Sequence, residues 1–135
     1  MNTNNTNTRT KLILPELSYQ VCGLCYETHN ELGRYSREKQ YGDSLENKFK
    51  LAGISYEREL RIEGTGNIAD FVLEGKILLE LKVKDAIDRD DYYQVQRYLQ
   101  ALNIPLGIII NFRTKYIRPK RVVKIETDNA AKFKD

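Results

Sequence analysis

NIADFVLEGKILLELKVK, residues 67–84, is the stretch that decides the fold of this chain. Aliphatic and β-branched residues dominate both arms and Gly75 lies between them, a pattern typical of two β-strands joined by a tight turn. A three-residue loop at Glu74-Gly75-Lys76, which is a common hairpin connection, pairs Leu73 with Ile77 and sets Asp70 opposite Glu80. The sequence therefore predicts a β-hairpin that carries two facing carboxylates.

The predicted register separates charged from apolar positions. One face carries Ile68, Asp70, Val72, Leu78, Glu80 and Lys82, and the other carries Ala69, Phe71, Leu73, Ile77, Leu79, Leu81 and Val83. The second face is wholly apolar, as a core face should be. A two-residue loop would instead set Asp70 against Leu79 and scatter the carboxylates over both faces, so the pattern favours the first register.

The two carboxylates need a positive partner. Directly opposed Cβ atoms lie about 4.5–5.5 Å apart in a sheet, and like charges at that distance repel. A divalent cation such as Mg²⁺ would relieve this repulsion, because it prefers carboxylate oxygens and completes its shell with water and substrate phosphate. Lys82 projects on the same side. The alternative is an exposed sheet face with scattered charges.

The length and the ends of the chain predict one domain. The 135 residues suffice for a core of moderate size, and we expect a single domain over residues 14–125, a polar leader over 1–13 and a polar tail over 126–135. No apolar run is long enough to cross a bilayer, and the leader lacks the apolar segment of a signal peptide. We therefore expect a cytoplasmic protein with no membrane partner.

Positive charge is concentrated near the C-terminus. The net charge of +3 does not by itself indicate nucleic-acid binding. Residues 113–124, however, contain no acidic residue, and Tyr116 stands among the cations. This run is a candidate phosphate-contacting surface, formed by Arg113, Lys115, Arg118, Lys120 and Arg121, with Lys124 at its end. The alternative is that these side chains only protect an edge strand from pairing with another chain.

Cys22 and Cys25 form a C-x-x-C within a helical stretch, and His29 follows one turn later. Without a second cysteine pair this is an incomplete zinc signature, and the favoured interpretation is free cysteine packed as a small apolar residue. We expect no structural disulfide in a cytosolic protein.

The spacing of apolar residues and the positions of capping and turn residues predict the remaining helices and strands. They are a helix over 14–32, a helix over 37–51 with Ser36 as its N-cap, a strand over 54–62 with outward charges, the hairpin, a helix over 90–102, a buried strand from 106 in parallel pairing, and an edge strand over 116–125 broken at Pro119. The order α-α-β-β-β-α-β-β predicts an α/β fold with a mixed central sheet flanked by helices.

Three polar residues stand on the helices in positions of interest. Glu38 lies on much the same face as the core residue Tyr41, although a carboxylate in a first turn is also favoured by the helix dipole alone. Gln94 and Tyr98 lie one turn apart, beside the apolar stripe of the helix over 90–102.

These residues together resemble a known nuclease group. Glu38, Asp70, Glu80-Leu81-Lys82 and Gln94-x-x-x-Tyr98, on helix, strand, strand and helix, resemble the PD-(D/E)XK nuclease superfamily and, within it, the GxxExxY protein family. The blocks HNELG, REKQY, ADFVL, LELK, QVQRYL and GIIINF follow that family's order across residues 17–123. The chain departs from the pattern at Tyr35, where the naming glycine would fall, and at Ala69, where the superfamily has proline.

The resemblance implies a restriction-endonuclease-like fold and Mg²⁺-dependent hydrolysis of nucleic acid, with DNA as the leading candidate and Mn²⁺ as a substitute metal. It implies that Asp70, Glu80 and the Leu81 carbonyl hold the metal, that Glu38 supports the metal or water, that Lys82 orients or deprotonates the water, and that Gln94 and Tyr98 steady the site. Whether attack is endo- or exonucleolytic, and whether the chain forms a homodimer, stays open. The alternatives are a catalytically silent module that binds nucleic acid or a protein partner, and a purely structural protein.

Overall fold

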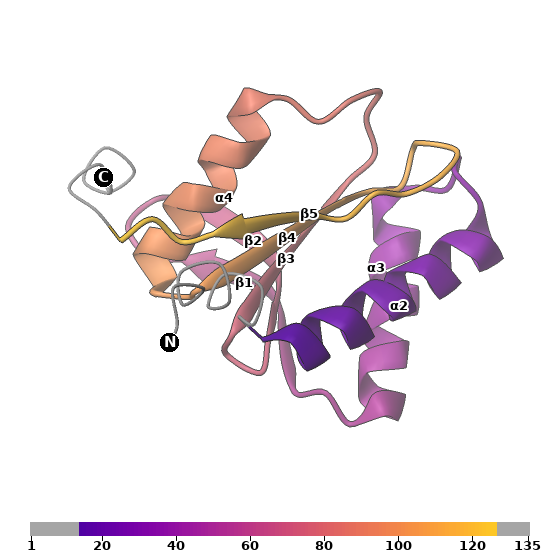
Figure 1. The fold of residues 1–135 in the computed structure, drawn as a ribbon, viewed down its shortest axis with the longest axis horizontal. Coiled ribbons are helices and arrows are strands. Elements are labelled where there is room, and N and C mark those ends of the chain that lie inside the picture. Colours follow the sequence, from indigo (N-terminus) through magenta and orange to yellow (C-terminus); the bar gives the residue numbers. More distant parts are fainter. Residues whose placement is uncertain (1–13, 127–135) are drawn as a thin grey trace, which may run out of the picture.

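The computed structural model describes residues 14–126, and the predicted leader and most of the predicted tail lie outside this range. The elements follow the predicted order α-α-β-β-β-α-β-β (Figure 1). They are α2 (Pro15–Leu32), α3 (Glu38–Ala52), β1 (Tyr56–Ile62), β2 (Asn67–Leu73), β3 (Ile77–Lys82), α4 (Arg89–Leu102), β4 (Leu106–Asn111) and β5 (Lys120–Val123). No helix in this part of the chain is both long and apolar enough to cross a bilayer.

The strands form one mixed sheet in the order β1-β2-β3-β4-β5. The strands β3 and β4 run in parallel, and every other neighbouring pair is antiparallel. The β4 sequence LGIIIN is buried along its whole length, which confirms the predicted buried parallel strand. A parallel pair needs a crossover connection, and α4 lies within the one that joins β3 to β4.

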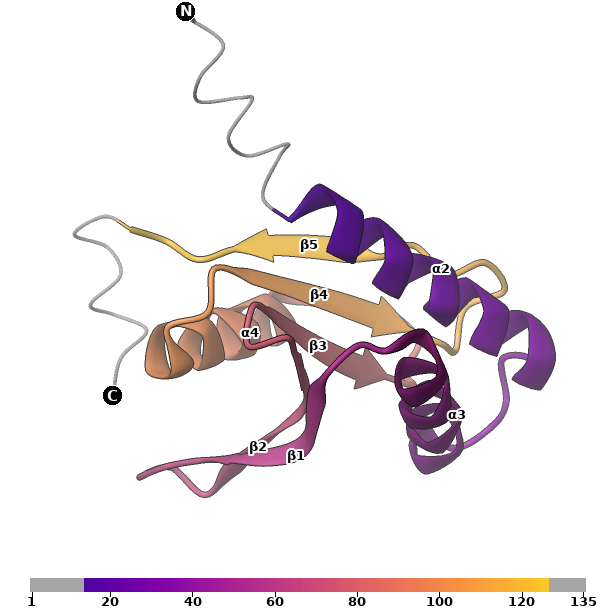
Figure 2. The same ribbon diagram turned by 90° about the horizontal axis from the view of Figure 1, so that it is seen from below.

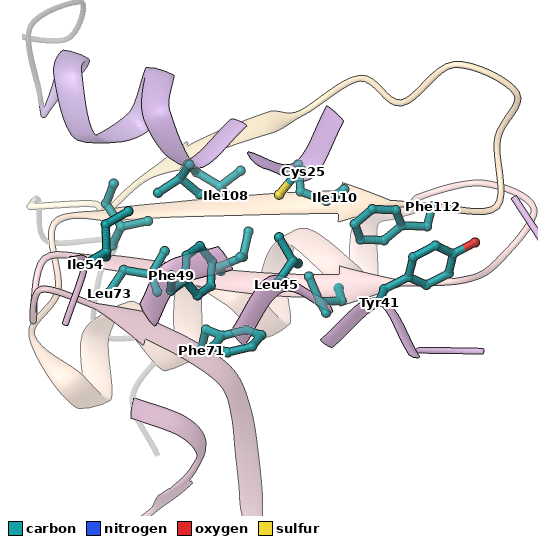
Figure 3. Close-up of a cluster of buried hydrophobic side chains, with 14 of the residues drawn as sticks. Cys25, Tyr41, Leu45, Phe49, Ile54, Phe71, Leu73, Ile108, Ile110 and Phe112 are labelled. Atoms are coloured by element: carbon teal, nitrogen blue, oxygen red, sulfur yellow. The ribbon is translucent and has the colours of Figure 1, made fainter. Parts of the chain in front are cut away.

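Helices cover both faces of the sheet (Figure 2). The helices α2 and α3 pack against one face through a core that includes Val21, Leu45 and Phe71, and α4 packs against the other through Val95 and Leu99. Figure 3 shows the first core, whose aromatic members include Tyr41, Phe49, Phe71 and Phe112. The Tyr41 ring stacks on Phe112 with the ring centroids 4.1 Å apart, so the start of α3 is fixed against the end of β4.

The helix α2 confirms the first predicted helix with a slightly rotated buried stripe. Its fully buried residues are Ser18, Val21, Cys25 and Thr28, whereas the predicted Leu17, Leu24 and Leu32 are only partly buried at the margin of the core. The small side chains of Ser18 and Cys25 occupy the part of the helix that lies closest to the sheet.

The predicted N-cap of the second helix was wrong by one residue. Arg37 caps α3, and its N–H donates to Oε1 of Gln40 at 2.8 Å. Ser36 is engaged elsewhere, since its hydroxyl donates to the Leu32 carbonyl at the end of α2 and its N–H donates to the Tyr41 hydroxyl. Gly53 ends the helix in a left-handed conformation.

The hairpin between β2 and β3 has the predicted register. Leu73 pairs with Ile77 and Val72 with Leu78. The loop closes through the Lys76 N–H, which donates to the Leu73 carbonyl at 2.9 Å. Glu74 and Gly75 both take positive φ angles, 55° and 65°, and glycine lowers the cost of this turn.

Ala69 departs from the face predicted for it. It packs with Val72 and Leu78 in the core on the α4 side, and not with Phe71 on the other side. The reason lies in β1, where Glu59 sits across from Asp70 with a φ of 55° and regular pairing skips both residues. The β1–β2 hairpin bends away from the rest of the sheet, as Figure 2 shows.

Two predicted boundaries move. The last strand is shorter than predicted, because β5 begins only after Pro119, which has no N–H to contribute to a ladder. The helix α4 begins one residue earlier than predicted, at Arg89, and its N-cap Asp88 accepts the N–H of Asp91.

Candidate active site

Asp70 and Glu80 end the regular pairing of β2 with β3. The ladder runs from Leu73↔Ile77 to Phe71↔Leu79 and does not include the next pair. The Asp70 N–H instead donates to Oε2 of Glu80 at 2.8 Å, and the Leu81 N–H donates to Oδ2 of Asp70 at 2.7 Å. Each carboxylate thus uses one oxygen to accept a main-chain N–H of the opposite strand, and the two groups are held side by side.

The surroundings of this pair disfavour two negative charges. Glu80 is only 3% exposed, and burial, followed by the neighbouring charge of Asp70, raises its pKa to about 8. Burial also raises the pKa of Asp70, while the Leu81 N–H and Lys82 act in the opposite direction. Two carboxyl groups held side by side, one buried and one half-buried, favour a proton or a cation between them at neutral pH.

Glu38 approaches the pair from α3, where it is the first helical residue. It lines a cavity of about 170 Å³ together with Asp70, Leu81 and Glu59. Burial and then the charge of Asp70 raise the pKa of Glu38, and Lys82 lowers it. Its position at a helix N-terminus also fits a dipole role, but the shared cavity places its carboxylate beside Asp70.

Lys82 is held at the end of β3 by one hydrogen bond and one ion pair to residues of α4. Its Nζ donates to Oε1 of Gln94 at 2.8 Å and lies 3.7 Å from Oδ1 of Asp91. The ammonium is therefore fixed in place and does not move freely on its four-carbon chain. This confirms that the structure brings the predicted Lys82 and Gln94 together.

Asp91 is a member of this cluster that the sequence reasoning missed. It is 7% exposed, it accepts Lys84 Nζ at 2.8 Å, and it accepts the N–H of Asp88. Burial opposes ionisation, but Lys84, the Asp88 N–H and Lys82 together lower the pKa of Asp91 below its usual value. The spacing Asp88-x-x-Asp91 at a helix start, a capping-box pattern, was the available signal.

Tyr98 and Leu81 complete the predicted set. Tyr98 is 4% exposed on α4, and burial, then Glu80 and Asp70, raise the pKa of its hydroxyl, so it lies near both carboxylates. Leu81 lines the cavity beside Asp70. The structure thus gathers the predicted catalytic and metal positions from α3, β2, β3 and α4 at one place, where the sheet departs from regular pairing.

Arg58 was predicted to face outward and does not. It lies on the inward side of β1 with its guanidinium 5.6 Å from the centre of the Phe71 ring, and it lines the cavity next to Asp70. Asp43 and Glu46 on α3 accept its Nη1 at 2.7 and 2.9 Å. The period of two in β1, which sets Arg58 on the side of Tyr56 and Leu60, was the signal that could have found it.

The basic run does not form one continuous surface. Lys115, Arg118 and Lys120 line a common cavity. Arg113 donates to the Arg34 carbonyl, and Arg121 donates to the Ser18 hydroxyl on α2, on the other side of the sheet. Lys124 pairs with Glu126 at 3.1 Å. Within this run, Lys115, Arg118 and Lys120 therefore remain the candidates for the predicted nucleic-acid contacts.

The two cysteines of the C-x-x-C motif pack in or beside the core, and the nearby His29 holds a loop. Cys25 is buried, Cys22 is partly buried and both are free thiols. His29 donates from Nε2 to the Thr114 carbonyl at 3.0 Å, so it holds the segment that follows β4.

The oxygen donors of this site match what Mg²⁺ requires. Within residues 14–126, no group of three or more His, Cys, Asp or Glu side chains is placed to hold a metal ion. Mg²⁺ usually takes one or two carboxylates and fills its other positions with water and phosphate. Asp70 and Glu80 supply such a pair, their mutual repulsion calls for a cation, and Glu38 lines a cavity together with Asp70. The residues present fit a hard divalent cation.

Comparisons with known proteins agree with this arrangement. A scan against protein-family models matched residues 15–124 to the model described as PD-(D/E)XK nuclease superfamily. The mixed five-strand sheet with its flanking helices is consistent with the restriction-endonuclease-like fold. Neither the comparison with curated proteins nor that with solved structures gave a match.

Proposed function

Since this chain belongs to the PD-(D/E)XK nuclease superfamily, we propose that it is a metal-dependent nuclease that hydrolyses phosphodiester bonds of nucleic acid, with DNA as the leading candidate. The observation that carries the proposal is the pair of cross-bonded carboxylates, Asp70 and Glu80, with the fixed ammonium of Lys82 next along β3. In a sheet with a purely structural role, the mutual repulsion of these two carboxyl groups would oppose the gain from their main-chain hydrogen bonds.

Within the superfamily, we propose membership of the GxxExxY family. The support is the order of the sequence blocks over residues 17–123, with Glu38 and Tyr41 retained. Tyr41 stacks on Phe112 and its hydroxyl donates to the Gly33 carbonyl, so the retained tyrosine fixes the start of α3 and with it Glu38.

Asp70 and Glu80, with the Leu81 carbonyl, would hold Mg²⁺ or Mn²⁺, and Glu38 would support the metal or its water. When bound, the metal supplies hydroxide near neutral pH and neutralises charge on the phosphoryl oxygens. The main-chain bonds from Asp70 and Leu81 fix both carboxylates before substrate arrives, so no reorganisation is needed during the reaction.

Lys82 would orient or deprotonate the attacking water. Because Gln94 accepts from its ammonium and Asp91 lies within ion-pair distance, the arrangement positions Lys82 to orient water and to stabilise negative charge in the transition state. Gln94 acts by holding Lys82, and Tyr98 packs behind the carboxylates, where its hydroxyl can steady the site or a phosphate.

The test combines cleavage with metal binding. The purified protein should cut DNA with Mg²⁺ or Mn²⁺ and stop when a chelator is added. Asp70→Asn and Glu80→Gln should abolish cutting while circular dichroism shows an intact fold, and Glu57→Gln, on the exposed side of β1, should cut like the parent. Cutting that survives both site substitutions would refute the assignment.

A calorimetric titration with Mn²⁺ separates the remaining alternatives. Heat of binding that is lost in Asp70→Asn supports the metal site, and a folded protein without metal affinity would be a structural one. A protein that binds nucleic acid but turns none over with any divalent metal would be the catalytically silent module.

A further inference from the structure

A second cavity, of about 480 Å³, opens beside the carboxyl ends of β3 and β4. Its volume falls within the range of pockets that hold small ligands, about 300–1,000 Å³. The residues that matter for its chemistry are two tyrosines, three cations and one amide: Tyr92, Asn111, Lys115, Tyr116, Arg118 and Lys120. Asp85 also lines it, so cations outnumber carboxylates in its wall.

The segment that forms this cavity is firmly held. Asn111 Oδ1 accepts the N–H groups of Lys84 and Arg113, and its Nδ2 donates to the Lys84 carbonyl. The Thr114 hydroxyl lies 3.3 Å from the Asn111 carbonyl and 2.9 Å from the Tyr116 carbonyl. His29 on α2 holds the Thr114 carbonyl from the other side. The cavity is therefore preformed.

The cavity adjoins the candidate active site. Asn111 lies directly across from Lys82 in the parallel ladder, and adjacent strands are about 4.8 Å apart. Tyr92 follows Asp91, the residue that faces Lys82 Nζ. A ligand in this cavity lies beside β4, the strand that pairs with β3 at Lys82.

We propose that this cavity binds an unpaired nucleotide of the substrate, so that the enzyme acts on single-stranded nucleic acid or on a strand end; this rests on the proposed nuclease function. The chemistry is the combination of ring and cation. Tyr116 is 69% exposed and Lys115 Nζ lies over one face of its ring, 5.5 Å from the ring centre, so a base stacked on the opposite face has a cation near its phosphate. Unpaired bases stack on aromatic side chains while basic residues track the backbone.

The residues of this cavity do not favour recognition of one particular base over another. The amide of Asn111 is occupied by main-chain partners at both its oxygen and its nitrogen. The remaining recognition is by ring stacking and by charge, which every base and every phosphate satisfies. Paired bases inside a duplex do not offer a ring face to Tyr116. We therefore expect preference for single strands with little dependence on sequence.

The experiment measures binding of labelled oligonucleotides by fluorescence anisotropy, in chelator, so that cleavage plays no part. The parent should bind a single strand more tightly than a duplex of equal length. Tyr116→Ala should weaken single-strand binding about tenfold, within the range of base–aromatic stacking, and leave duplex binding nearly unchanged. Tyr116→Phe, which keeps the ring, should bind like the parent, and Tyr92→Ala should weaken binding in the same direction as Tyr116→Ala.

The matched control is Tyr19→Ala. Tyr19 is 83% exposed on α2, which packs on the opposite face of the sheet from α4, so its loss should leave single-strand binding unchanged. Unchanged single-strand binding in folded Tyr116→Ala and Tyr92→Ala, or an equal loss in Tyr19→Ala, would overturn the inference. If the protein cleaves nucleic acid but these variants bind normally, the cavity assignment fails and the nuclease stands. If single strands bind through Tyr116 but nothing is cut, the nuclease proposal fails and the cavity assignment stands.

Discussion

At the scale of single residues, Asp70 and Glu80 combine a structural and a chemical role. One oxygen of each carboxylate replaces a main-chain carbonyl as the acceptor of an N–H, at the point where the ladder between β2 and β3 stops. The second role follows from burial, which makes a proton or a metal ion necessary between them. Fold stability and metal binding are therefore linked through the same two side chains.

The linkage gives a pH dependence. Burial and Asp70 raise the pKa of Glu80 from 4.5 to about 8 in the folded chain. Between these values the unfolded carboxyl is ionised while the folded one keeps its proton, so the free energy of unfolding should fall as pH rises from about 4.5 to about 8. Urea unfolding in chelator, compared between parent and Glu80→Gln, isolates this contribution.

Metal should reverse the effect. With saturating Mn²⁺ the ionised pair is stabilised, and the fall in stability with pH should disappear or change sign. A parent whose stability rises with pH relative to Glu80→Gln in chelator would show that the carboxyl group is ionised in the folded apo protein.

Lys82 and Lys84 are a matched pair for mutation. Both form ion pairs with Asp91, but only Lys82 belongs to β3, the strand that carries Glu80. Lys82→Ala should lower turnover strongly while Mn²⁺ affinity stays nearly constant or increases, since a cation that repels the metal is lost. Lys84→Ala should change turnover little and lower stability only slightly, because ion pairs of exposed side chains contribute little. Turnover and calorimetry decide, and if metal affinity collapses in Lys82→Ala while turnover only halves, Lys82 is structural.

At the scale of elements, α4 and β4 meet most closely at Gly107. A Cβ placed there would lie 2.6 Å from Cγ1 of Val95, which is too close for any real contact. Gly107→Ala should therefore force α4 away from β4 and destabilise the protein by about 1–3 kcal/mol.

In α2, a Cβ at Gly23 would meet nothing within 4 Å, so Gly23→Ala should stabilise the protein by about 0.5–1 kcal/mol through helix propensity. Urea midpoints of the two variants should move in opposite directions.

The same elements show which features of the fold a sequence can predict. The hairpin and its three-residue turn follow from a pattern of period two and one glycine, the buried strand β4 follows from a run that is apolar on both faces, and the structure confirms all three. The predicted N-cap at Ser36 and the predicted face of Ala69 were wrong because contacts that the local pattern does not show decide them. Ser36 is occupied by Leu32 and Tyr41, and the bend at Ala69 depends on Glu59 in another strand.

The candidate site was predictable where its residues share one hairpin or one helix face. Asp70, Glu80 and Lys82 follow from the alternation of β2 and β3, and Gln94 from its helical spacing. Asp91 and Arg58 were missed because each looked like an ordinary surface charge. Only the packing of α4 on the sheet, and of α3 on β1, turns Asp91 toward Lys82 and Arg58 toward the cavity.

At the scale of the whole molecule, the distribution of cations predicts the salt dependence of binding. Neutralising Lys115, Arg118 and Lys120 together should reduce the slope of log affinity against log salt by about two to three, with little sequence dependence. Neutralising Arg113 and Arg121 should change the slope less, because both donate to groups of the protein. Binding titrations at several salt concentrations provide the measurement, and equal slopes in the triple variant and the parent would mean that these residues only protect the edge strand.

The hydrogen bonds of Asp70 and Glu80 also determine how this protein can lose its activity during evolution. Asparagine and glutamine keep an acceptor oxygen where aspartate and glutamate have one, so Asp70→Asn and Glu80→Gln preserve the bonds that join β2 to β3 while removing the charge that holds a metal. Each exchange needs a single nucleotide change in the codon. A lineage of this protein can therefore lose its chemistry in one step and keep its architecture, and inert relatives should be recognised by an amide at either position within an otherwise unchanged hairpin.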